Sequence, residues 1–177
     1  MNFDNFEYIL IGIFLFLIYF LIRNGVKQCP GNKIMIIFGV KNRHLPYKIV
    51  ESKTTFIIPF LHIVKYFDLS VFTKEFRFNA KDENNTKFSL DVKFEYSIST
   101  EPVILDNAVK RMIDLPVERI EKLGEQIILV GAKKILEDRP VKKNDHIKLE
   151  RDLSDSIMFD LEKQGFRLNS IKIDFYE

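Results

Sequence analysis

Apolar and polar residues alternate most regularly along residues 86–99, near the middle of the chain. Apolar side chains occupy every second position there, and charged or hydroxyl side chains occupy the positions between them. This period of two predicts a long strand with one face on a core and the other face in water. The apolar set consists of Phe88, Leu90, Val92, Phe94, Tyr96 and Ile98.

Shorter apolar segments earlier in the chain predict further strands. Residues 33–39 form a β-branched run that ends in a glycine, which is typical of a buried strand. Two more candidates cover residues 45–50 and 54–58, where prolines mark strand edges or ends. Residues 66–79 alternate in part and predict either one bent strand or two.

Three helical segments follow the long strand, each with apolar residues recurring every three or four positions. The first opens at a proline, with Thr100 as its candidate N-cap. The second opens at Pro116. The third begins near residue 144 and ends at Gly165, a natural C-terminal cap.

The last residues, 166–177, alternate again, but the parity shifts at Asn169–Ser170. A β-bulge there would put both apolar sets on one face. The order of strands, helices and a final strand predicts an α+β domain over residues 29–177, a mainly antiparallel sheet packed with about three helices. We expect the strands over residues 33–39 and 166–176 to present sheet edges.

The most hydrophobic part of the chain is residues 8–22, an unbroken apolar run. Fifteen helical residues cover about 22 Å, less than the roughly 30 Å hydrocarbon core of a bilayer. A helix from about Phe6 to Arg23, with Glu7 and Arg23 reaching the two interfaces, comes close to spanning. We therefore predict a membrane anchor and juxtamembrane segment over residues 1–28.

Two other interpretations of the apolar run differ in what they require of its flanks. A cleaved signal peptide needs a basic start and a small-residue cleavage site, and the chain has neither. A shallow hairpin that enters one leaflet stays open, because the run is short and contains Gly12. Between Arg23 and Lys48 there are six basic residues and no acidic one. The positive-inside rule then predicts a cytoplasmic domain.

Aromatic and basic side chains mark the positions expected to contact lipid. In and after the anchor these are Tyr8, Phe14, Phe16, Tyr19, Phe20, Arg23 and Lys27. A second uncharged apolar stretch, residues 54–61, is either a buried strand with its exit turn or a segment that dips into the cytoplasmic leaflet. In the second case the contacts are Phe56, Ile57, Phe60 and Leu61.

Composition and motifs give little sign of chemistry. A formal net charge of +2 does not suggest a nucleic-acid binder. The phosphate-binding, dinucleotide, serine-hydrolase and zinc-protease motifs are absent, and the three histidines lie far apart. We expect no enzymatic activity, cofactor, metal or small-molecule substrate. The single cysteine, Cys29, directly follows the anchor, and it is either an incidental small residue or a candidate for acylation at the membrane surface.

Short segments spread from Cys29 to Asp174 match, in order, the motifs of one known family. They are CPGNKIMIIFG after the anchor, TFIIPF, ISTEP followed by Asn107–Ala108, QIIL with Asp138–Arg139, LEKQGF and IKID. In this the chain resembles the flotillins, within the stomatin, prohibitin and flotillin superfamily (SPFH, or band 7). The segment at residues 51–53 departs from it by lacking the usual His-Gly-Gly.

The resemblance implies a band 7 domain in a membrane-bound scaffold, which organises lipid and protein microdomains by assembling with itself or with longer flotillin-like chains. The alternative that it implies is a tethered regulator of a protease or of another membrane protein. Flotillins continue into a long coiled coil that these 177 residues do not contain. Without that coil we expect only weak self-association.

Overall fold

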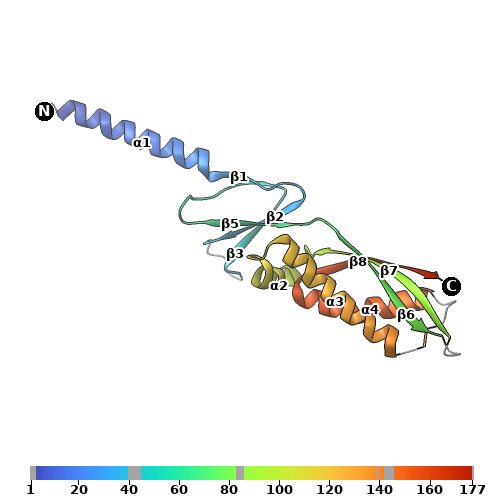
Figure 1. Ribbon diagram of the computed structural model, residues 1–177. Helices are drawn as coiled ribbons and strands as arrows, with labels where there is room; N and C mark the ends of the chain where they lie inside the picture. Colours follow the sequence, from blue (N-terminus) through green and yellow to red (C-terminus); the bar gives the residue numbers. More distant parts are fainter. Residues whose placement is uncertain (1–2, 40–44, 83–85, 139, 142–145, 177) are drawn as a thin grey trace. The chain divides into compact units, whose positions relative to one another are not determined.

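The computed structural model describes residues 3–39, 45–82, 86–138, 140–141 and 146–176. The helices are α1 (Phe3–Gly25), α2 (Pro102–Met112), α3 (Val117–Asp138) and α4 (His146–Gln164) (Figure 1). The strands are β1 (Val26–Gln28), β2 (Lys33–Phe38), β3 (Tyr47–Glu51), β4 (Thr54–Phe56), β5 (Ile63–Asp68), β6 (Phe72–Lys81), β7 (Lys87–Ile98) and β8 (Phe166–Tyr176). Every strand pair is antiparallel, so the predicted α+β class is confirmed for these residues.

The chain divides into two compact units, Met1–Asp68 and Leu69–Glu177. The partly alternating stretch at residues 66–79 forms two strands, β5 and β6, and the boundary between the units falls between them. This division differs from the expected one, which placed a single boundary after residue 28.

The first unit contains α1 and two small sheets. β1 pairs with β4, and β2 lies between β3 and β5 in a three-stranded sheet. The prediction that residues 33–39 form a sheet edge is therefore wrong. The four residues from Ile34 to Ile37 are buried on both faces of the sheet. A continuous apolar run, in place of an alternating one, is typical of a strand whose two faces are both covered.

The second unit is a sheet in the order β6–β7–β8, packed on one face by α2, α3 and α4 (Figure 1). The apolar set of β7 lies on the helix side, as the alternation predicts. Glu95 lies opposite Ser170 while Tyr96 lies opposite Leu168, so Asn169 is an extra residue in β8. The predicted bulge is confirmed, and it aligns the apolar residues on both sides of it with those of β7.

The helix ends follow local sequence signals with one exception. α2 opens at Pro102, α3 follows Pro116, and Gly165 ends α4 with a φ of +101°. The predicted cap, Thr100, is wrong, because Glu101 is the N-cap residue and makes no side-chain capping bond. Its own N–H donates to the Ser99 hydroxyl at 3.2 Å. The predicted start of the third helix, near residue 144, lies outside the described residues.

Candidate membrane interface

Within the described part of the chain, α1 is the one helix long and apolar enough to cross a membrane. The stretch that meets this test, Glu7–Gly25, has 19 residues and covers about 28 Å, close to the roughly 30 Å of the hydrocarbon core. The helix is longer than predicted at both ends, because it begins at Phe3 and continues past Arg23 to Gly25. Length and composition are also met by a signal sequence and by the core helix of a soluble protein.

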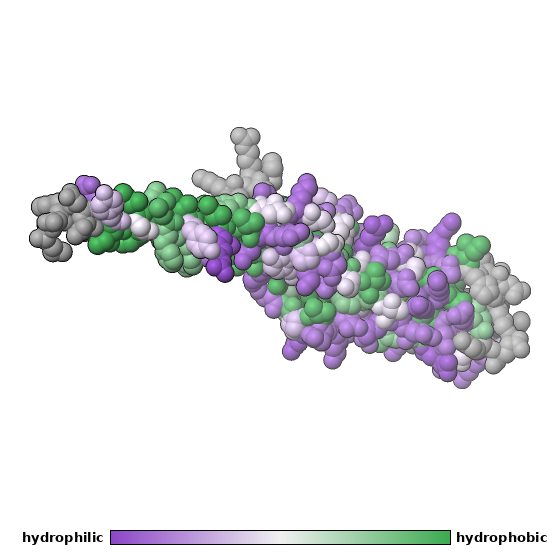
Figure 2. Space-filling model, turned by 90° about the horizontal axis from the view of Figure 1, so that it is seen from above, coloured by the Kyte–Doolittle hydropathy of each residue, from purple (hydrophilic) through white to green (hydrophobic). Residues whose placement is uncertain are grey.

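The side chains of α1 are exposed from Tyr8 to Ile22. Figure 2 shows them as a hydrophobic surface along the helix. Of the five aromatic residues predicted to contact lipid there, four are more than half exposed and Phe20 is partly covered. The Arg23 guanidinium donates to the Tyr19 hydroxyl at 3.3 Å, so the polar tips of both side chains gather near the C-terminal end of the helix. An all-round apolar surface suits hydrocarbon better than water.

The end of α1 is joined directly to β4. The backbone carbonyl of Gly25 accepts a hydrogen bond from the N–H of Ile57 at 2.8 Å. The Phe56 ring lies so close to Gly25 that a Cβ atom there would sit 2.5 Å from it. Val26 pairs with Phe56 in the β1–β4 ladder. The position of α1 therefore fixes the position of Phe56.

Residues 56–63, which we call the apolar turn, run from the last residue of β4 to the first residue of β5. They carry most of the unit's other exposed hydrophobic side chains. The exposed members are Phe56, Ile58, Phe60, Leu61 and Ile63. Phe60 has 91% of its surface exposed, which is the highest value among the exposed large hydrophobic residues of the described chain. Three of the four contacts predicted in this stretch, Phe56, Phe60 and Leu61, thus lie at the surface.

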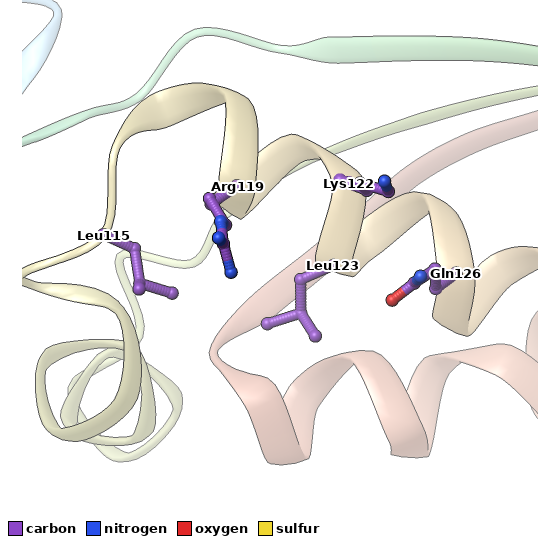
Figure 3. Close-up of a pocket in the computed structure, with 5 residues that line it drawn as sticks. All are labelled: Leu115, Arg119, Lys122, Leu123 and Gln126. Carbon is purple, nitrogen blue, oxygen red and sulfur yellow. The ribbon is translucent and has the colours of Figure 1, made fainter.

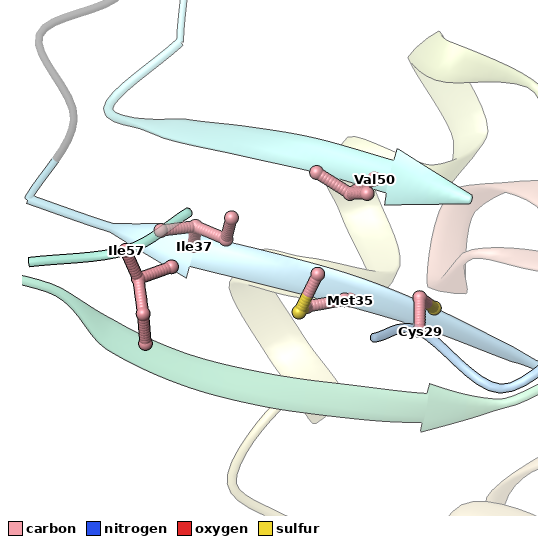
Figure 4. Close-up of a cluster of buried hydrophobic side chains, with 5 residues drawn as sticks. All are labelled: Cys29, Met35, Ile37, Val50 and Ile57. Atoms are coloured by element: carbon pink, nitrogen blue, oxygen red, sulfur yellow. The ribbon is translucent and has the colours of Figure 1, made fainter. Parts of the chain in front are cut away.

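The fourth predicted contact, Ile57, points the other way. It is only 5% exposed and packs in a cluster with Cys29, Met35, Ile37 and Val50 (Figure 4). Ile58 and Ile63 are exposed but were not predicted. The alternation of a strand could have predicted this. When it is continued from β4, residues 56 and 58 lie on one face and residue 57 lies on the other.

Cys29 is also a member of that buried cluster. Its thiol is part of a side chain only 3% exposed, and Sγ lies 3.0 Å from the backbone carbonyl of Lys33, to which it can donate (Figure 4). An acyl-transfer enzyme needs access to the sulfur, so acylation would require this segment to open. The structure favours the interpretation of Cys29 as a small core residue.

The second unit has a cleft of about 490 Å³ beside α3. Its lining residues are Leu115, Arg119, Lys122, Leu123 and Gln126 (Figure 3). The lining offers two cations and an amide but no carboxylate, thiol, hydroxyl or imidazole. Of these residues only Lys122 is of a type that serves as a nucleophile or general base, and the lining places no carboxylate, imidazole or thiol beside it.

The described residues contain no group of three or more His, Cys, Asp or Glu side chains that could hold a metal ion. Comparison with known proteins does not identify the chain. No family model matches it, and no curated protein matches it either.

Proposed function

We propose that this chain is a membrane-anchored scaffold of the flotillin type, with its folded part in the cytoplasm. The observation that carries the proposal is α1, an exposed apolar helix long enough to span and tied at Gly25 to the first folded unit. The basic residues at its C-terminal end, Arg23 and Lys27, suit an anionic cytoplasmic leaflet.

The order of elements supports the band 7 part of the proposal. An apolar helix is followed by strands, then by helices, then by a last strand. The segments that resemble flotillins fall on distinct elements: CPGNKIMIIFG runs into β2, LEKQGF joins α4 to β8, and IKID lies within β8.

Assembly is proposed to use the membrane and the sheet edge at β8. β8 has β7 on one side and, among the described residues, no strand on the other. An unpaired edge is a template for pairing with a second chain, and confinement by anchors raises effective concentration. One edge buries little area, and small interfaces are weak. We expect weak self-association or co-assembly with a longer flotillin-like chain.

The anchor is tested by Leu15→Arg, which puts a charge in the middle of α1. An arginine at the centre of a spanning helix costs about 2.5–3.5 kcal/mol of insertion free energy. The fraction of full-length chain that stays with membranes after an alkaline wash should fall sharply, while Leu15→Val should behave as the parent does. If Leu15→Arg is retained as well as Leu15→Val, α1 does not cross the bilayer.

A further inference from the structure

Phe60 combines two unfavourable features in one residue. It is 91% exposed to water, and its φ of +74° lies in the left-handed region that side chains rarely adopt. A glycine at this position would relieve the backbone strain, and a polar residue would remove the exposed apolar surface. Backbone strain at an exposed apolar residue is a recurrent sign of a binding function.

The backbone of the turn is already hydrogen-bonded within itself. The N–H of Ile58 donates to Nδ1 of His62 at 3.0 Å, and the N–H groups of Leu61 and His62 both donate to the Ile58 carbonyl, at 3.2 and 3.1 Å. The turn packs closely against Gly39, the residue after β2, where an added Cβ atom would lie 2.3 Å from the Leu61 carbonyl oxygen. Backbone groups paired in this way can leave water without losing partners.

The direction of the strands points the apolar turn toward the membrane side of its own unit. β1 runs away from α1, and β4 is antiparallel to β1, so the chain leaves Phe56 heading back toward α1. Figure 1 shows the connection into β5 on that side of the unit. The other end of the unit's sheet, where Lys33 pairs with Asp68, lies about 17 Å from the end where Phe38 pairs with Ile63.

The charges around the turn suit an anionic lipid surface. No acidic residue occurs between Ser52 and Phe67, while Lys53 and Lys65 do. Lys27 is exposed on β1, next to β4. An apolar tip with a basic surround is the pattern of an interfacial membrane contact.

We propose that the apolar turn is a preformed wedge that inserts into the leaflet at the C-terminal end of α1, with Phe60 and Leu61 at the boundary between headgroups and acyl chains. The partner of this surface is therefore lipid and not a protein. The inference rests on the proposed function, since α1 determines which leaflet the turn meets. Ile57 stays in the core and holds the base of the wedge.

The absence of tryptophan from the chain makes depth measurable with single reporters. Full-length Phe60→Trp and Leu61→Trp chains are reconstituted into vesicles of phosphatidylcholine and phosphatidylglycerol, with bromine placed near the glycerol or near the acyl-chain end. Phe14→Trp reports on α1. Asn32→Trp is the control, because Asn32 is exposed in the turn before β2, at the far end of the same unit.

The wedge predicts that Phe60→Trp and Leu61→Trp are quenched several-fold more strongly than Asn32→Trp, with shallow bromine the better quencher. Phe14→Trp should respond best to deep bromine. If Phe60→Trp and Leu61→Trp match Asn32→Trp while Phe14→Trp is quenched, the wedge is refuted and the anchor stands. If Phe14→Trp is not quenched, the anchor fails, and the two turn reporters alone decide whether the turn binds lipid.

Discussion

Among the described residues, Asp91 is the one charged residue that the second unit buries in its sheet. It lies opposite Arg77 in the β6–β7 register, and the guanidinium donates to both carboxylate oxygens, at 2.7 and 2.8 Å. These hydrogen bonds from Arg77 hold the pKa of Asp91 below its usual 3.8, although burial acts in the opposite direction. Alternation places both residues on the polar face, but it does not reveal that one of them is 9% exposed.

The Asp91–Arg77 pair predicts a pH-dependent contribution to stability. A carboxylate whose folded pKa is lowered stabilises the fold above its unfolded pKa, and this contribution is lost as the pH falls through the folded pKa. Arg77→Gln should therefore lower the thermal midpoint at neutral pH, and the difference from the parent should shrink as the pH drops below 3.8. Arg167→Gln makes the same change on the same face, opposite Ser97, and should show no such trend. A difference for Arg77→Gln that is constant with pH would count against the pair.

The residues of the candidate site could be predicted only in part, and the reason is physical. The apolar stretch at residues 54–61 marks a surface or a core equally well, because hydrophobicity alone does not say which solvent a side chain meets. The strand period separates Ile57 from its neighbours once the strand is known. The burial of Cys29 depends on the long-range cluster with Val50 and Ile57, which no local pattern shows.

At the scale of elements, the connection between α4 and β8 depends on one glycine. Gly165 has a φ of +101°, and a Cβ atom there would lie 2.4 to 2.5 Å from Ala108 of α2. Its carbonyl also accepts a hydrogen bond from the N–H of Ser99 at 3.0 Å. The glycine was predicted as a helix cap, and the structure adds that Ala108 of α2 packs directly against it.

Gly165→Ala should destabilise the second unit by more than about 2 kcal/mol, from the left-handed backbone and the overlap with α2 together. Gly31→Ala is the matched control, because no atom lies within 4 Å of the added methyl group. The free energies of unfolding of the two variants and the parent are compared in urea. Equal effects at Gly165 and Gly31 would show that α2 does not pack where the structure places it.

Long periodic elements were predictable and pairing partners were not. The alternation of β7 and the bulge in β8 follow from parity along the chain. The central place of β2 does not, because a short apolar run has the same appearance at an edge when another element covers it. The split between β5 and β6 could not be predicted either, because both strands alternate and only their pairing partners differ.

At the scale of the whole molecule, the sequence predicts an anchor and a folded α+β part but not the division into two units. That division depends on which strands pair. In the second unit, β7 pairs with β8 although α2, α3 and α4 lie between them in the sequence. Each unit carries one part of the proposed function. The first holds the anchor and the apolar turn, and the second holds the free edge of β8.

The central claim is that the anchored chain assembles in the membrane. It is tested most directly by the mass of the full-length chain in native nanodiscs, excised from membranes at graded expression levels. We predict several chains per disc, in steps of 20.9 kDa, with the number falling as expression falls. One chain per disc at every level, or one constant heterologous partner that is not flotillin-like, would contradict the scaffold, and the second result would favour the tethered regulator.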